Sequence, residues 1–262
     1  MNTIIYITIF IIGTLFGSFF TLATYRIPIK QDITHTHSYC PNCNSKLGFF
    51  ELIPVLSYIF LKGKCKHCGK KISPRYIIFE IMSGLTFLLF ALSLNINMQT
   101  SINLYIYFIF VILYLTFIFL IAGIDKENIK IDKSVLIFGG VISVLYIVYL
   151  YIIEKVSIYR YIIYLAIYVL LTIVQFIITK KKKKENYTIG ILTLLTIMII
   201  FTAEYVTINT IIIALFAIAI YLLIYKIKNK SIKTKATYKL PIGYFLSISN
   251  IIVFLIITFL VS

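Results

Sequence analysis

The sequence predicts an all-α polytopic membrane protein, with eight transmembrane helices and a small zinc-binding loop domain between the first two. Of the 262 residues, 61% are hydrophobic and only 13% are charged, whereas a soluble globular protein has about 25% charged residues. Eight spans of about 20 residues need about 160 apolar positions, which this composition supplies. The composition thus excludes an ordinary soluble domain.

Eight apolar runs define the predicted helices. They lie at residues 4–24, 76–94, 104–124, 134–153, 159–179, 188–203, 206–225 and 242–261. Only Glu204 and Tyr205 separate the sixth run from the seventh, so a tight hairpin is expected there. The first run has no basic residue before it and Arg26 soon after it, which predicts a permanent helix rather than a cleaved signal peptide. Its Gly13 and Gly17 form a GxxxG pattern that is expected to pack within the monomer.

Basic residues are segregated between alternate loops. Of the 25 Lys and Arg residues, 23 lie in the connections 26–75, 126–133, 180–184 and 226–239, while Lys155 and Arg160 lie in an intervening one. Because Lys and Arg collect on the cytoplasmic side of membranes, these four loops are predicted to be cytoplasmic and both termini to be outside. The run Lys180–Lys184 is then a topology signal. The net charge of +16 needs no nucleic acid to explain it, and none is expected as a partner.

All four cysteines lie in the first of these loops, as Cys40-Pro41-Asn42-Cys43 and Cys65-Lys66-His67-Cys68. Two thiolates of one CxxC turn can reach the same ion, and two such turns complete a tetrahedral zinc site. Four sulfur ligands leave no open coordination position, so the zinc is expected to be structural. Redox-active or incidental cysteines are the alternatives, and a reducing cytoplasm argues against two disulfides.

Several segments around the cysteines and near the C-terminus form a second pattern. They are Gly17-Ser18-Phe19, Tyr25-Arg26-Ile27-Pro28, Leu47–Tyr58, Ile72–Tyr76, Glu80 and Leu240-Pro241-Ile242-Gly243-Tyr244-Phe245-Leu246. Together with the cysteines, they resemble the bacterial type IV prepilin peptidases, and the similarity runs from the first helix to the last.

This resemblance implies an aspartic endopeptidase of the bacterial cell membrane, with the lipid bilayer and type IV pilin-like precursors as partners. Such enzymes remove the precursor's leader, and many then N-methylate the new N-terminus from S-adenosylmethionine. The implied domains are a transmembrane helix at 1–25, the four-cysteine zinc domain at 26–75 and a seven-helix peptidase-like region at 76–262.

The resemblance also implies catalytic residues. Asp125, at the end of the third helix, matches the family's first catalytic aspartate. The second belongs to a Gly-x-Gly-Asp motif that is missing here: Thr188 stands where the aspartate would be, and Tyr187 where its preceding glycine would be. Glu185 and Asp132 are possible substitutes. Because aspartic catalysis uses two carboxylates that share one proton, cleavage at a normal rate requires such a substitute.

Three functions therefore compete. The first is an active prepilin peptidase that uses Asp125 and an unconventional second acid. The second is a catalytically impaired paralogue that binds precursors or aids pilus or secretion assembly. The third, a transporter or channel, is disfavoured because the predicted spans carry almost no ionisable residues at mid-membrane. An acid within about 6 Å of Asp125 would permit a coupled pair and favour the first function.

Overall fold

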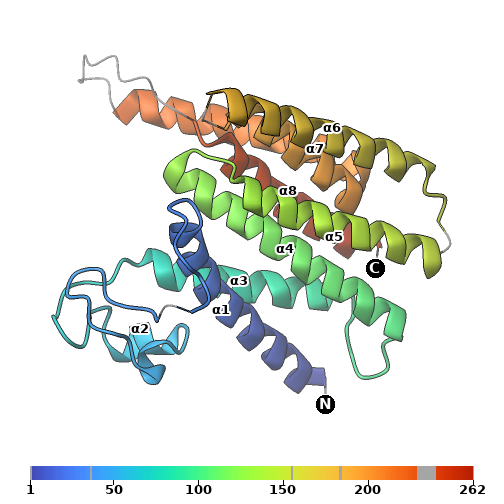
Figure 1. The fold of residues 1–262 in the computed structure, drawn as a ribbon. Coiled ribbons are helices and arrows are strands. Elements are labelled where there is room, and N and C mark those ends of the chain that lie inside the picture. The colour runs from blue at the N-terminus through green and yellow to red at the C-terminus, as the bar shows by residue number, and fades with distance from the viewer. Residues whose placement is uncertain (1, 36, 155, 183–184, 229–239, 262) are drawn as a thin grey trace. The chain divides into compact units, whose positions relative to one another are not determined.

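The computed structural model describes residues 2–35, 37–154, 156–182, 185–228 and 240–261. The helices are α1 (Asn2–Arg26), the short 3-10 helix η1 (Phe49–Glu51), α2 (Leu56–Phe60), α3 (Arg75–Ser93), α4 (Ile102–Asn128), α5 (Lys133–Ile152), α6 (Tyr159–Lys182), α7 (Tyr187–Lys228) and α8 (Ile242–Val261) (Figure 1). Within these ranges there are two isolated β-bridges and no strand. The predicted all-α class is confirmed.

Seven of these helices are long and apolar enough to cross a membrane: α1, α3, α4, α5, α6, α7 and α8. They coincide with the apolar runs of the sequence, and the protein is a multi-pass membrane protein. Some basic residues used to predict the orientation lie outside the described ranges, namely Lys155, Lys183, Lys184, Lys230, Lys233, Lys235 and Lys239.

The longest element, α7, consists of two helices. A straight helix of 42 residues would extend about 63 Å, twice the thickness of a bilayer core of about 30 Å. The helix is broken at Ala203, whose φ of 65° and ψ of 168° are not helical. The break lies one residue before the predicted turn at Glu204 and Tyr205.

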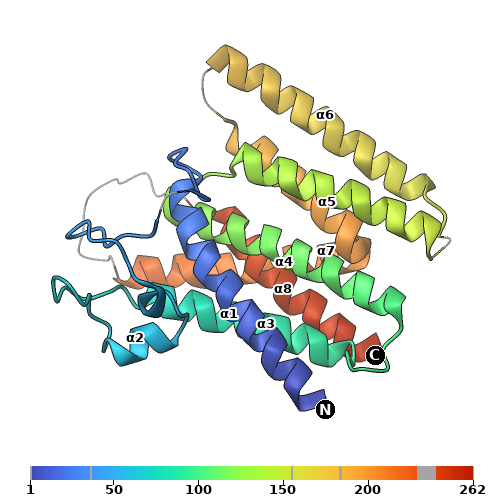
Figure 2. The same ribbon diagram turned by 60° about the horizontal axis from the view of Figure 1, so that its bottom comes forward.

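Contacts with α8 show that the second half of α7 folds back. At the start of α7, the Tyr187 hydroxyl lies 3.3 Å from the backbone nitrogen of Gly243. Near the end of α7, the ring of Tyr221 lies 5.4 Å from that of Phe245. Both ends of α7 therefore lie beside the same end of α8, and Figure 2 shows the change of direction. The eight predicted spans are present as seven helical elements because two of them are joined within α7.

The chain forms two compact units, Met1–Phe108 with Ser262, and Ile109–Val261. In the first unit, α1 packs closely against α3 through the two glycines of the GxxxG pattern. A Cβ atom at Gly17 would lie 2.6 Å from the Cα of Glu80, and one at Gly13 would lie 2.8 Å from the Cα of Gly84. The predicted packing of this pattern within the monomer is confirmed.

The second unit has an aromatic and polar core. The ring of Phe201 stacks at 4.6 Å between those of Tyr114 and Tyr146. Tyr114 also donates a 2.7 Å hydrogen bond to Asn250, whose amide donates to the Thr210 hydroxyl at 3.1 Å. These bonds satisfy polar groups that lie away from solvent and hold α4, α7 and α8 in one register.

Candidate functional site

The four cysteines converge on one point in the loop between α1 and α3. Their sulfur atoms all lie within 4.8 Å of one another, and the Sγ atoms of Cys40 and Cys68 are 3.9 Å apart. A tetrahedral site with Zn–S bonds of about 2.3 Å requires sulfurs about 3.8 Å apart. The cluster is therefore positioned to bind a metal ion and is consistent with zinc. It is the one such group of three or more His, Cys, Asp or Glu side chains among the residues that the structure describes.

The two cysteine turns have the same backbone structure. In the first, Cys40 donates to the Ser45 carbonyl and Asn44 donates to the Cys40 carbonyl; in the second, Cys65 donates to the Lys70 carbonyl and Gly69 to the Cys65 carbonyl. The residue after the second cysteine has a φ of 55° at Asn44 and 70° at Gly69. Glycine and asparagine tolerate this left-handed conformation best. The sequence Cys-x-x-Cys followed by Asn or Gly therefore specifies each turn.

The surroundings differ among the four cysteines. Cys40 and Cys65 are buried, while Cys43 and Cys68 are exposed. Hydrogen bonding with Ser45 lowers the pKa of the Cys43 thiol to about 6, whereas burial and the neighbouring thiols raise the pKa of the Cys68 thiol to about 11. His67 lies within the second turn but has its Nε2 atom 3.6 Å from a carboxylate oxygen of Glu51.

Glu80 ties this loop to the membrane helices. Its side chain is buried within α3, where its carboxylate accepts hydrogen bonds from the backbone N–H of Val55 at 2.7 Å and from the hydroxyl of Ser18 on α1. Val55 has a φ of 62°, which β-branched residues rarely adopt. The buried carboxylate thus holds a strained turn immediately before α2.

Arg26 fixes the chain at the other end of the loop. It lies in the last turn of α1 and is buried. Its guanidinium donates to the backbone carbonyls of Asp32 at 2.9 Å and His37 at 3.1 Å. The path from α1 to the first cysteine turn is therefore set by one buried cation.

Asp125 lies in the second unit and caps the N-terminus of α8. It is fully buried, and its Oδ2 atom accepts a hydrogen bond from the backbone N–H of Tyr244 at 2.9 Å. The first N–H groups of a helix lack partners within that helix and carry positive partial charge. A carboxylate from α4 therefore completes the start of α8.

Tyr187 is the side chain that contacts Asp125. Its hydroxyl donates to the Asp125 Oδ2 atom at 3.0 Å and also accepts from the N–H of Gly243. Gly243 is required by close approach, because a Cβ atom there would lie 2.6 Å from Ile131 and 3.0 Å from Asp125. The C-terminal segment that contributed to the family resemblance therefore lies against Asp125.

The other predicted catalytic candidates have different contacts. Thr188 is exposed, and its backbone N–H donates to the Asn186 side chain that caps α7. Asp132 caps α5 and pairs with Lys130 at 2.9 Å, while Glu185 pairs with the same lysine at 3.4 Å. The side chains of Asp132 and Glu185 thus share a cation, and the contacts of Asp125 come from residues that are not acids.

Sequence reasoning missed the role of Tyr187, because the family comparison treated it only as a lost glycine. The nearest sequence signal was the Leu240–Leu246 segment, where Pro241 precedes a helix start. A helix N-terminus attracts a carboxylate, but the sequence does not indicate which one.

One segment of the chain matches a known protein family. Residues 11–94, which contain α1, the four-cysteine loop and α3, match the family described as "Bacterial Peptidase A24 N-terminal domain". The matched residues all lie in the first unit. No solved structure shows significant similarity to the chain.

The chain is also similar to individual curated proteins. The chain is 39% identical over 79 residues to the prepilin leader peptidase/N-methyltransferase of Myxococcus xanthus, a match that covers 30% of this chain and 24% of the relative. It is 44% identical over 79 residues to that of Bacillus subtilis, covering 30% and 32%, and 38% identical over 86 residues to that of Vibrio cholerae, covering 29% and 34%. Part of the chain is therefore similar to proteins named prepilin leader peptidase/N-methyltransferase. It spans about a quarter to a third of the length of these relatives.

Proposed function

We propose that the protein is a prepilin peptidase, which removes the leader of type IV pilin-like precursors at the cytoplasmic face of a bacterial cell membrane. The observation that carries this proposal is the position of Asp125, at the end of a membrane-spanning helix and against the Leu240–Leu246 segment. From the distribution of basic residues, we assign the four-cysteine loop to the cytoplasm and both termini to the outside. The four cysteines of this loop are proposed to bind a structural zinc ion. N-methylation belongs to the proposal because the relatives' name includes N-methyltransferase, and S-adenosylmethionine is the methyl donor that the family resemblance implies.

In this mechanism, Asp125 acts as the base and the hydroxyl of Tyr187 replaces the missing second acid. The hydroxyl is already 3.0 Å from the carboxylate. Asp125 would draw a proton from the attacking water and return it to the leaving amine as the C–N bond breaks. Tyr187 would donate a hydrogen bond to the scissile carbonyl as negative charge develops there. Asp132 and Glu185 are less suited because each pairs with Lys130. The bound zinc would supply no chemistry beyond cross-linking the two cysteine turns.

A second candidate function is favoured by the burial of Asp125. The carboxylate is fully buried and is engaged by the start of α8, so α8 must shift before a peptide can reach it. On this alternative, the protein is a catalytically impaired member that binds precursors or aids pilus or secretion assembly, and Asp125 serves to hold α8.

Reconstituted protein and a purified precursor separate the two functions. Leader release is followed by mass, and precursor binding by co-purification, for the wild type, Asp125→Asn, Tyr187→Phe and the exposed control Thr188→Ala. If Asp125 and Tyr187 form an active pair, Asp125→Asn should lose cleavage and Tyr187→Phe should lower kcat by about 10²–10³. Both variants should still bind the precursor. Thr188→Ala should cleave and bind as the wild type does. Binding without cleavage in the wild type would establish the impaired member. Absence of both activities would refute both candidates.

A further inference from the structure

The four-cysteine loop carries an exposed apolar surface between its two cysteine turns. It consists of Phe49, Phe50, Leu56, Ile59 and Phe60, and the three phenylalanines are 78%, 80% and 78% exposed. These side chains belong to η1 and α2, which lie outside the membrane-spanning helices. An exposed apolar cluster of this kind marks an interaction surface.

Contacts with α3 place this surface at the membrane boundary. The N–H of Val55, immediately before α2, donates to Glu80, and Glu80 lies five residues beyond Arg75, where α3 begins. At 1.5 Å per residue, that contact is about 7.5 Å along the axis of α3. The 19 residues of α3 extend about 28 Å, close to the thickness of a bilayer core. The start of α2 therefore lies level with the first turns of a spanning helix.

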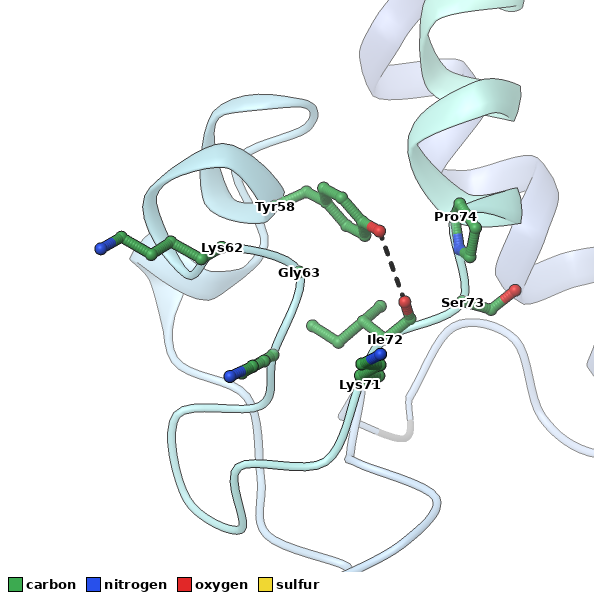
Figure 3. A pocket seen from close by; sticks show the side chains of 8 residues that line it. Tyr58, Lys62, Gly63, Lys71, Ile72, Ser73 and Pro74 are labelled. Carbon is green, nitrogen blue, oxygen red and sulfur yellow. Dashed lines mark hydrogen bonds between the residues drawn. The ribbon is translucent and has the colours of Figure 1, made fainter.

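The middle of α2 contacts the segment that leads into α3. The hydroxyl of Tyr58 donates to the carbonyl of Ile72, two residues before the Pro74 that precedes α3 (Figure 3). The start of α2 is thus linked to α3, and its middle to the segment that leads into α3.

Lysines surround a depression beside this surface. The depression has a volume of about 410 Å³ and lies between the end of α2 and the segment leading into α3 (Figure 3). Its charged lining residues are Lys62, Lys64 and Lys71, and Tyr58 and Ser73 also line it. Lysine amino groups and hydroxyls suit the phosphate of a lipid headgroup.

We propose that η1 and α2 insert their apolar side chains into the bilayer interface, while the lysine-lined depression holds the headgroups of anionic phospholipids. Apolar residues next to lysines are typical of helices that lie in the plane of a membrane surface. The depth of the Val55 contact along α3 favours lipid over a soluble protein as the occupant. This role is independent of the proposed proteolysis: it fixes the height of the four-cysteine loop above the bilayer.

Fluorescence quenching tests the proposal in the full chain. The chain contains no tryptophan, so Phe60→Trp reports only on this surface in protein reconstituted into vesicles. Lys66→Trp, an exposed position in the second cysteine turn, is the aqueous control, and Leu15→Trp, an exposed position on α1, is the lipid-facing control. Phe49→Trp is the alternative probe if Phe60→Trp loses its bound metal. We expect lipids brominated in their acyl chains to quench Phe60→Trp several-fold more strongly than Lys66→Trp.

A second quenching experiment tests whether the depression prefers anionic headgroups. The vesicles contain a fixed minor fraction of brominated lipid, which is either phosphatidylglycerol or phosphatidylcholine. We expect stronger quenching of Phe60→Trp by the anionic lipid, loss of that preference when Lys62, Lys64 and Lys71 are all changed to Gln, and no competition by inorganic phosphate. Equal quenching by both lipids would overturn the headgroup site. Quenching of Phe60→Trp by aqueous acrylamide, as in the Lys66→Trp control, would overturn insertion. Protection from both quenchers would also overturn it and assign the surface to a protein contact.

Discussion

Gly17→Ala is expected to separate α1 from α3, because the added methyl group has no room. Its Cβ atom would lie 2.6 Å from the Cα of Glu80 and 2.9 Å from the carbonyl oxygen of Phe79. Both are backbone atoms of α3, so no side-chain rotation can relieve the overlap. The distance to Glu80 must increase by at least 0.8 Å, from 2.6 to 3.4 Å, to reach ordinary contact.

Two opposing effects determine the free energy of unfolding of this variant. Replacing glycine by alanine in a helix stabilises it by about 0.5–1 kcal/mol. Overpacking against a rigid partner costs about 1–3 kcal/mol, and here it also displaces Glu80 from its hydrogen bonds with Ser18 and Val55. We therefore expect a net loss of about 1–2 kcal/mol, which is a factor of about 5–30 in the unfolding equilibrium.

Unfolding of the full chain in detergent micelles, followed by circular dichroism as dodecyl sulfate is added, measures this loss. Gly48→Ala is the matched control, because the nearest atom to its Cβ would be a flexible carboxylate oxygen of Glu51 at 3.4 Å, and it should change stability by less than about 0.5 kcal/mol. If Gly17→Ala unfolds at the same detergent fraction as Gly48→Ala or at a higher one, the close packing of α1 on α3 is not a source of stability.

Three further predictions concern the metal, an acid and the orientation. Purified protein should contain one zinc per chain, and Cys65→Ser should lower that content sharply because a closed structural site needs four ligands; metal analysis that finds no zinc in the wild type contradicts the assignment. Hydrogen bonds from the backbone and side chain of Thr34 lower the pKa of Asp32 from 3.8 to about 2, so they favour the folded loop above about pH 4 and are lost as the pH falls through 2. Thr34→Ala should move the carboxyl titration measured by NMR upward, and an unchanged midpoint would show that its hydroxyl has no effect. A cysteine introduced at position 182 should resist an impermeant reagent applied to intact cells, whereas one at Gln99 should react; the reverse pattern would invert the topology.

The sequence predicts features that depend on neighbouring residues. Apolar runs define the spans because a membrane requires about 20 apolar residues in succession, and paired CxxC motifs define the metal cluster because their spacing fits one ion. The turn between the sixth and seventh spans was located to within one residue, since only Glu204 and Tyr205 interrupt the apolar run.

Features that depend on distant residues were not predictable in this way. Tyr187 is 62 positions from Asp125 along the chain, and Tyr244 is 119 positions from it. No periodicity relates such residues, and their meeting depends on how α4, α7 and α8 pack. The hydrogen bond between Val55 and Glu80 could not be predicted either, because a buried carboxylate that holds a strained turn has no local sequence pattern.

The repeated structure of the cysteine turns has a consequence for how the loop assembles. Each turn is stabilised by its own backbone hydrogen bonds, so each can present two sulfurs before the other arrives. Joining them closes a ring through the 21 residues between Cys43 and Cys65, at an entropic cost of about 2.7 kcal/mol plus a constant. Zinc binding to structural sites contributes about 10–16 kcal/mol, which exceeds that cost. Because η1 and α2 lie within the ring, metal capture would restrict the segment that carries the phenylalanines from both sides, in addition to the hydrogen bonds of Val55 with Glu80 and of Tyr58 with Ile72.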